Sequence, residues 1–241
     1  MLTKERLIVA LDFAEEQAVK DLVEKLGDEV VYYKVGMELY YSVGPSILDY
    51  LAHKGKKIFL DLKLLDIPNT VAQAMANLAV RPGIDIVNVH ASGGPTMMKE
   101  SADRMRAAAK KAGLTPPKLI AVTLLTSLGE DEWARLNGRL SLREQVVSLA
   151  KLTKESGLDG VVASPQEAAA IREACGEDFL IITPGIRPAG SDVGDQVRIA
   201  TPASALAAGS DYLVVGRPIS QAADPALMAR QIVSEVEGYQ K

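Results

Sequence analysis

The chain of 241 residues contains very little cysteine or histidine, with one cysteine (Cys175) and two histidines. A single cysteine excludes a disulfide within the chain and a cysteine-rich metal site. No apolar stretch approaches the roughly 18 residues of a membrane span. With a net charge of -4 and no long basic run, general nucleic-acid binding is not expected. The N-terminus enters a strand-like run rather than a signal peptide. These absences favour a cytoplasmic enzyme or binding protein.

The rest of the chain alternates short β-branched runs with segments of helical period. Its composition, 48% apolar and 24% charged, is that of an ordinary globular protein. The predicted strands are residues 6–12, 29–36, 57–63, 85–90, 118–123, 159–163, 179–183 and 211–215. The predicted helices are residues 15–26, 45–53, 68–80, 95–112, 142–155, 166–174 and 203–208, with a final helix through 228–236.

Eight strand–helix units in this length predict an α/β fold, a single-domain (β/α)8 TIM barrel over residues 1–241. Strands that are apolar on both faces and are each followed by a helix indicate a parallel sheet covered by helices. An open doubly wound sheet is the rival fold, but no Gly-rich fingerprint follows the first strand. Residues 129–140, which carry the only tryptophan, do not fit the alternation of strands and helices. They predict a short inserted helix.

The stretch from Asp61 to Thr70 (DLKLLDIPNT) concentrates charge at the end of the third strand. Alternate side chains of a strand share a face, so Asp61 and Lys63 point the same way as Phe59. Asp66 adds a second carboxylate, and proline at position 68 suits the first turn of a helix. A solvated surface strand is the ordinary explanation of such charges, but the intervening leucines need burial. A functional site is therefore the better hypothesis.

In such barrels the site forms at the C-terminal strand ends. Those positions hold Asp12, Lys34, Asp61, Lys63, Asp66, His90, Thr123, Thr126, Ser127, the run Pro184–Gly185–Ile186–Arg187, Gly216 and Arg217. Gly216 and Arg217, which we place at the start of the last helix, predict a phosphate site. The polar segment from Arg187 to Gln196 is predicted to act as a lid over a ligand. His90 is more simply a polar residue of the barrel mouth than a catalyst. An ammonium among carboxylates keeps its proton, so Lys63 is predicted to be a general acid rather than a Schiff-base amine.

Together these motifs resemble the orotidine 5'-phosphate decarboxylase family, nearly from end to end. The matching segments are Ala10–Leu11–Asp12, the Lys34 strand, the DxKxxDIPNT string, Leu125–Thr126–Ser127, Pro184–Gly185–Ile186–Arg187, Gln196 and Val215–Gly216–Arg217–Pro218. Hexulose-phosphate synthase shares the DxKxxD core, but the IPNT continuation and Gln196 point away from it. A non-catalytic binding barrel is the other alternative, and retention of both Asp61 and Lys63 argues against it.

The resemblance implies decarboxylation of orotidine 5'-monophosphate (OMP) to uridine 5'-monophosphate (UMP) in pyrimidine biosynthesis, with no metal and no cofactor. It implies that Lys63 stabilises and then protonates a C6 carbanion, with Asp61, Lys34 and Asp66 as its charged neighbours. Substrate contacts are expected from Asp12, Lys34, Thr70, Thr126, Pro184, Arg187, Gln196, Gly216 and Arg217. Thr126 is preferred over Thr123 and Ser127 for the pyrimidine. Asp66 and Thr70 are expected to reach the neighbouring subunit's site, which implies a homodimer with composite active sites.

Overall fold

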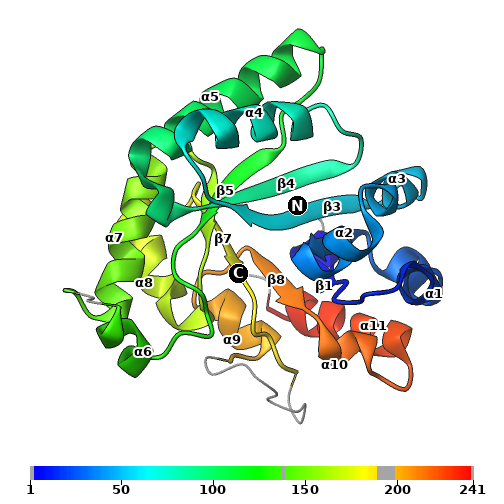
Figure 1. Cartoon of the computed structure of the whole chain (residues 1–241). Helices are drawn as coiled ribbons and strands as arrows, with labels where there is room; N and C mark the ends of the chain where they lie inside the picture. Colours follow the sequence, from blue (N-terminus) through cyan, green and yellow to red (C-terminus); the bar gives the residue numbers. More distant parts are fainter. Residues whose placement is uncertain (1–2, 137–138, 189–198, 240–241) are drawn as a thin grey trace.

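A computed structural model describes residues 3–136, 139–188 and 199–239 of the chain. Within these residues eight parallel strands pair in sequence order and close into a barrel (Figure 1). Closure comes from β1 and β8, which pair with Ile8 opposite Val214. The predicted (β/α)8 fold is therefore confirmed.

The strands lie close to their predicted positions. They are β1 Leu7–Ala10, β2 Tyr32–Gly36, β3 Lys57–Leu64, β4 Ile84–His90, β5 Lys118–Val122, β6 Gly160–Val162, β7 Leu180–Thr183 and β8 Tyr212–Val215.

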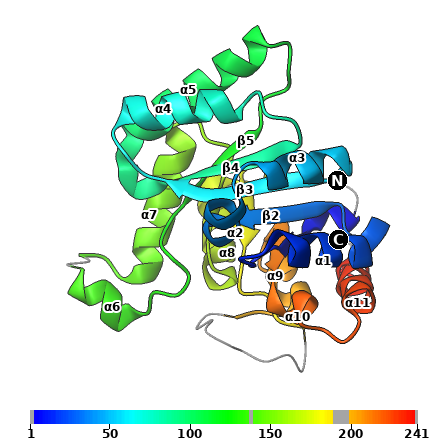
Figure 2. The ribbon, with the colours of Figure 1, turned by 45° about the vertical axis from the view of Figure 1, so that its right-hand side comes forward.

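The main helices also match the predicted segments, and Figure 2 shows α4 and α5 packed side by side along one flank of the barrel. The α-helices are α1 Glu16–Leu26, α2 Met37–Val43, α3 Ser46–His53, α4 Pro68–Leu78, α5 Gly94–Lys111, α6 Glu130–Arg135, α7 Leu142–Glu155, α8 Pro165–Cys175, α9 Pro202–Ala207, α10 Arg217–Ser220 and α11 Pro225–Glu237. Short 3-10 turns cover Thr3–Arg6, Gly27–Glu29 and Ala91–Gly93. Among the residues described, no helix has both the length and the apolar character needed to cross a membrane.

Two short helices were not predicted. The helix α2 follows β2 directly and buries only Leu39, so it has no apolar periodicity for a sequence pattern to detect. The helix α10 begins at Arg217 and ends at Ser220, before α11 begins at Pro225. The prediction that Arg217 begins the last helix is therefore wrong, because Arg217 begins α10 and the last helix is α11. The predicted inserted helix is present as α6, with the indole N–H of Trp133 donating to the carbonyl of Leu140 at 2.8 Å.

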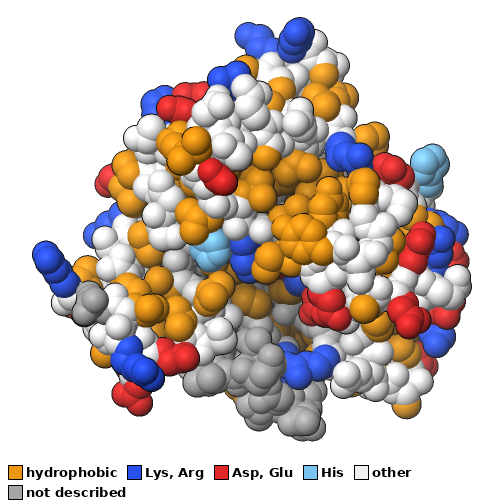
Figure 3. All heavy atoms as spheres, in the orientation of Figure 1, with side chains coloured by type: hydrophobic (Ala, Val, Ile, Leu, Met, Phe, Trp, Pro, Cys, Tyr) orange, Lys and Arg blue, Asp and Glu red, His pale blue; other side chains and the backbone are white. Residues whose placement is uncertain are grey.

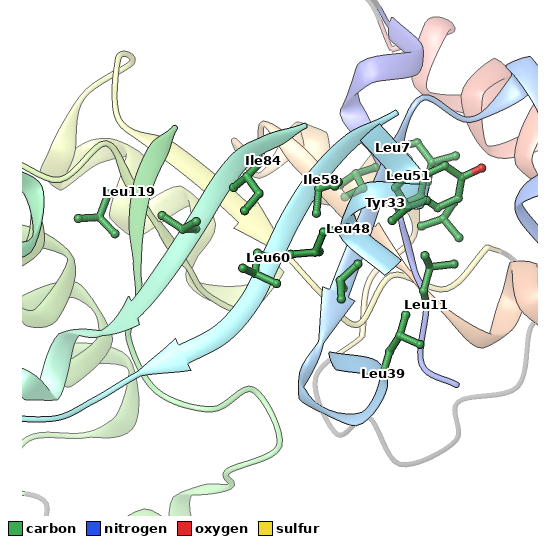
Figure 4. Packing of buried hydrophobic residues seen from close by; sticks show 14 of the residues in the cluster. Leu7, Leu11, Tyr33, Leu39, Leu48, Leu51, Ile58, Leu60, Ile84 and Leu119 are labelled. Atoms are coloured by element: carbon green, nitrogen blue, oxygen red, sulfur yellow. The ribbon is translucent and has the colours of Figure 1, made fainter. Parts of the chain in front are cut away.

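Apolar side chains of the strands divide into two layers. One set fills the barrel interior: Ile8, Ala10, Tyr32, Phe59, Ile86, Ile120, Val122, Val162, Ile182, Tyr212 and Val214. Their neighbours along the same strands face the helices, as Figure 4 shows for Ile58 and Leu60 of β3 beside Leu48 and Leu51 of α3. Burial on both faces explains why these strands are continuous apolar runs in the sequence. It also means that a polar residue on the inner face of a strand needs a partner inside the barrel.

Arg172 joins several segments at the N-terminal end of the barrel. Its guanidinium donates to the carboxylate of Asp211 at 2.7 Å and to four backbone carbonyls at 2.7–2.9 Å, those of Gly176, Glu177, Phe179 and Gly209. Its side chain is only 12% exposed. Removing it therefore leaves several acceptors without their donor in a site with little water.

We expect Arg172→Ala to lower the free energy of unfolding by about 3 kcal/mol, measured by urea denaturation. Arg104→Ala is the matched control, because Arg104 lies exposed on α5 and such a change costs at most about 0.5 kcal/mol. Equal unfolding free energies for the two variants would contradict this role of Arg172.

Candidate active site

The C-terminal ends of the strands surround a cavity of about 660 Å³. Lysine and arginine side chains are visible around the hollow of this face, together with hydrophobic side chains (Figure 3). The cavity is lined by predicted site residues, namely Asp12, Lys34, Asp61, Lys63, Thr126, Pro184, Arg187, Gly216 and Arg217. Apolar side chains of the barrel interior, including Phe59, Val122 and Val214, form its floor. A cavity of this size is within the range of small-molecule sites.

Four charged side chains from adjacent strands form a row along one wall. The ammonium of Lys63 lies 2.8 Å from one oxygen of Asp61, and the ammonium of Lys34 lies 3.5 Å from the other. Lys34 also donates to Asp12 at 2.9 Å. The charges thus alternate in the order Asp12, Lys34, Asp61, Lys63. Asp61 is the most enclosed, with 9% of its side chain exposed.

Lys34 is held in its charged form. Burial by itself lowers the pKa of this lysine, but the carboxylates of Asp61 and Asp12 outweigh that effect and raise its pKa above the usual value. Lys34 is therefore a fixed positive charge at neutral pH. It neutralises part of the negative charge that Asp61 brings into a poorly hydrated site.

Asn88 on β4 completes the row and was not singled out from the sequence. It is 1% exposed. Its amide nitrogen donates to Asp61 at 2.7 Å, and its amide oxygen accepts from the backbone N–H of Lys63 at 2.8 Å. The available signal was a single amide between Val87 and Val89 of β4, on the same face as Ile86, which lies in the barrel interior.

The backbone of β3 is irregular where it carries these residues. Lys63 has a φ of 52°, the one positive φ of a non-glycine residue in the described part of the chain. The register with β4 shifts here, because Leu60 pairs with Val87 whereas Leu64 pairs with Val89. The predicted alternation holds for Phe59, which lies in the barrel interior, but the position of Lys63 depends on this irregularity. A positive φ at a residue other than glycine strains the backbone. Such strain persists only where surrounding contacts impose it, and it is concentrated at functional sites.

His90 lies half-buried at the end of β4. Burial first, and then the nearby charge of Lys63, lower the pKa of its imidazole. It is therefore neutral at neutral pH. As the pH falls below the unfolded value of about 6.5, the unfolded chain binds this proton more readily than the folded one, so stability is lost.

We expect NMR titration to show that His90 protonates below the usual histidine value of about 6.5. We also expect His90→Gln to lose less unfolding free energy than the wild type between pH 7.5 and pH 5.5. Protonation of His90 above pH 6.5 would contradict this assignment.

The opposite wall of the cavity comes from the loops after β7 and β8. Gly185 has a φ of 77°, a conformation that favours glycine. Arg187 is 7% exposed, and its guanidinium donates to the carbonyl of Ile186 at 3.0 Å. A parallel bridge between Ile186 and Ala200 joins the two segments that flank the predicted lid. Gln196 and most of that predicted lid, residues 189–198, lie outside the described residues.

The three candidates for the pyrimidine contact differ in position. Thr126 lines the cavity. The hydroxyl of Thr123 is buried and donates to the carbonyl of Val162 at 3.1 Å, while Ser127 is not among the lining residues. The contact of Thr126 with the pyrimidine stays a prediction.

Asp66 and Thr70 are not brought into this cavity. Both are exposed, and a carboxylate oxygen of Asp66 accepts from the backbone N–H of Ile67 at 2.6 Å. The large apolar side chains beside Asp66 are exposed as well, Leu65 by 55% and Ile67 by 67%. Asp66 and Thr70 therefore do not contribute to the cavity of their own chain.

Known proteins share both the sequence and the fold of this chain. The family model described as "Orotidine 5'-phosphate decarboxylase / HUMPS family" matches residues 5–232. The orotidine 5'-phosphate decarboxylase of Moorella thermoacetica is 48% identical over 98% of this chain and 94% of that protein. The enzyme of the same name from Carboxydothermus hydrogenoformans is 47% identical over 97% of both chains.

Among solved structures, the orotidine 5'-phosphate decarboxylase of Lactobacillus acidophilus superposes with a TM-score of 0.84. It is 46% identical, and the match covers 95% of this chain and 98% of that one. An uncharacterized conserved protein from Geobacillus kaustophilus also has a TM-score of 0.84, at 44% identity and with 95% and 99% of the two chains covered.

Proposed function

The chain belongs to the orotidine 5'-phosphate decarboxylase / HUMPS family, and from this premise we propose that it converts OMP to UMP and carbon dioxide in the cytoplasm, without a cofactor. The observation that carries the proposal is the alternating row of Asp12, Lys34, Asp61 and Lys63 on one wall of the cavity. The names of the curated relatives favour this reaction over that of a sugar-phosphate synthase.

The proposed reaction breaks the bond between C6 of the pyrimidine and its carboxylate. Carbon dioxide leaves, and the electron pair of that bond remains on C6 in the plane of the ring, where the π system cannot delocalise it. The ammonium of Lys63 stabilises this charge as it develops and then transfers a proton to C6, giving UMP. Solvent afterwards returns a proton to the lysine.

Asp61 and Lys34 set the electrostatics of this step. Asp61 lies beside the leaving carboxylate and orients the Lys63 ammonium, which is 2.8 Å away. Lys34 compensates Asp61 from the other side. Because these charges are fixed before substrate binds, little reorganisation is needed when negative charge appears on C6.

The rest of the nucleotide is held by the other lining residues. Asp12 and Lys34 contact the ribose, and Thr126 contacts the pyrimidine edge, with Pro184 beside it. The phosphate binds to Arg217 and the backbone of Gly216, with Arg187 and Gln196 contributing from the loop after β7. The binding energy of this remote phosphate is then available to order the site around C6.

We also propose that the working enzyme is a homodimer in which Asp66 and Thr70 of each chain enter the partner's site. The supporting observations are that neither residue lines its own cavity and that Leu65 and Ile67 are exposed beside Asp66. Large apolar side chains in such a cluster are typical of a surface that another chain covers.

Incubating purified, chelator-treated protein with OMP tests the reaction, with the pyrimidine absorbance followed over time. Loss of the absorbance of the carboxylated pyrimidine is the expected result. Unchanged absorbance would overturn the proposed reaction. Activity that appears only with added magnesium and a sugar phosphate would instead assign the chain to the synthase branch.

The phosphate contact gives a separate prediction. We expect Arg217→Ala to lower kcat/KM for OMP by about 100-fold, because charge-assisted hydrogen bonds to the phosphate are lost. Inhibition by UMP should weaken to a similar degree, whereas inhibition by uridine, which has no phosphate, should not change. Arg230→Ala is the control, since Arg230 lies on α11 paired with Glu29 at 3.2 Å and does not line the cavity. Equal weakening for UMP and uridine would contradict the assignment.

A further inference from the structure

Asn88 occupies the point where the pairing of β3 with β4 is interrupted. Between the pairs Leu60–Val87 and Leu64–Val89, three residues of β3 lie opposite one residue of β4, which is Asn88. The backbone N–H of Lys63 falls in this gap. Its acceptor is the side-chain oxygen of Asn88, 2.8 Å away. The side chain of Asn88 therefore supplies a bond at a place where the ladder is irregular.

The same amide also holds Asp61. Its nitrogen donates at 2.7 Å to the carboxylate oxygen that receives the Lys63 ammonium at 2.8 Å. These two contacts fix the orientation of the amide, because rotating it by half a turn would place its oxygen against a carboxylate and its NH₂ against an N–H group. With 1% of Asn88 exposed, water has little access to replace either bond.

We propose that Asn88 is a positioning residue for the reaction: it fixes the Asp61 carboxylate and the left-handed backbone of Lys63 relative to each other. This inference rests on the proposed function. Asn88 is not among the residues that line the cavity, so it acts through Asp61 and Lys63 rather than on the substrate. Its removal leaves both charged groups present but allows their separation and direction to change.

This role predicts a specific kinetic signature. Misplacing catalytic groups by about 1 Å costs about 100-fold in rate, whereas the phosphate of the product binds on the opposite wall of the cavity. We therefore expect Asn88→Ala to lower kcat about 100-fold while KM for OMP and the affinity for UMP change by less than about threefold. A side chain that only fills space would affect thermal stability without this separation of kcat from KM.

Two further variants separate positioning from packing. Asn88→Asp has nearly the same shape and keeps an acceptor for the Lys63 N–H, but it sets a second carboxylate against Asp61. We expect a loss of kcat at least as large as for Asn88→Ala. Asn88→Thr keeps one hydroxyl that both donates and accepts on a shorter arm, and we expect its kcat to lie between those of Asn88→Ala and the wild type.

Val87→Ala is the matched control on the same strand, because Val87 faces the helices. We expect it to lower the melting temperature and to keep kcat within about twofold of wild type, since it touches no charged group of the site. If the wild type decarboxylates OMP and Asn88→Asp keeps kcat within about threefold of it, the positioning role is wrong. If the wild type does not decarboxylate OMP, the proposed function fails, and this inference fails with it.

Discussion

Replacing Lys63 by alanine is expected to lower turnover of OMP by at least about 10⁴-fold while leaving UMP affinity within about tenfold of wild type. The variant loses both the proton donor and the positive charge that stabilises the C6 carbanion. It also leaves the enclosed carboxylate of Asp61 without the ammonium that lies 2.8 Å away in the wild type. The phosphate contacts lie on the opposite wall of the cavity, so binding of the product is largely retained.

Lys57→Ala is the matched control for this experiment. Lys57 begins the same strand, β3, and pairs with Glu5 at 2.8 Å, so the same substitution is made at the other end of the barrel. We expect its turnover to be unchanged. Turnover is measured from pyrimidine absorbance, and UMP affinity by calorimetry. Turnover by Lys63→Ala within tenfold of wild type would rule out Lys63 as the general acid.

The barrel could be predicted from the sequence because its strands are buried on both faces. Such strands are continuous apolar runs, and each run here is followed by a segment of helical period. The capping box at the start of α7, formed by Ser141 and Glu144, is a further local signal of this kind. Elements without these signals were missed. The helix α2 buries a single side chain, and α10 is a four-residue turn of helix.

Much of the charged row was also predictable. Asp12, Lys34 and Asp61 lie at or near the ends of adjacent strands, and parallel strands bring their C-terminal ends to one rim. Strand alternation then places Asp61 on the inner face. These are local rules that need no knowledge of which side chains touch.

Asn88 could not be found in this way, because its role depends on the register between β3 and β4. The shift in pairing between Leu60 and Leu64 and the positive φ of Lys63 arise from contacts between strands. An asparagine between two valines of a strand indicates a buried polar contact, but the sequence does not identify its partners. Local sequence rules are expected to fail at strained functional positions of this kind.

Asp66 illustrates a different limit, because its predicted role lies in another chain. We expect Asp66→Ala in both subunits to lower kcat about 100-fold or more, because the partner's Lys63 loses a neighbouring carboxylate. Yet Asp66 is exposed in its own chain and does not line that chain's cavity. If each active site were formed by a single chain, Asp66→Ala would therefore have no effect on turnover. The size of its effect therefore reports directly on composite sites.

Mixing two inactive variants gives the sharper test. In a dimer of one Lys63→Ala chain and one Asp66→Ala chain, one site carries both changes and the other carries neither. With equal amounts and random reassociation, about half of the dimers are mixed, so about a quarter of all sites regain wild-type composition. We therefore expect the reassociated mixture to recover up to about a quarter of wild-type turnover, although each variant alone is nearly inactive.

The control mixture combines Lys63→Ala with Lys34→Ala. Lys34 and Lys63 both contact Asp61 of their own chain, so every site in a mixed dimer still lacks one of the two lysines, and no activity should return. Recovery with the Asp66 pair and none with the Lys34 pair assigns Asp66 to the partner's site. If neither mixture recovers turnover although mixed dimers form, Asp66 acts within its own chain, and the composite site is wrong.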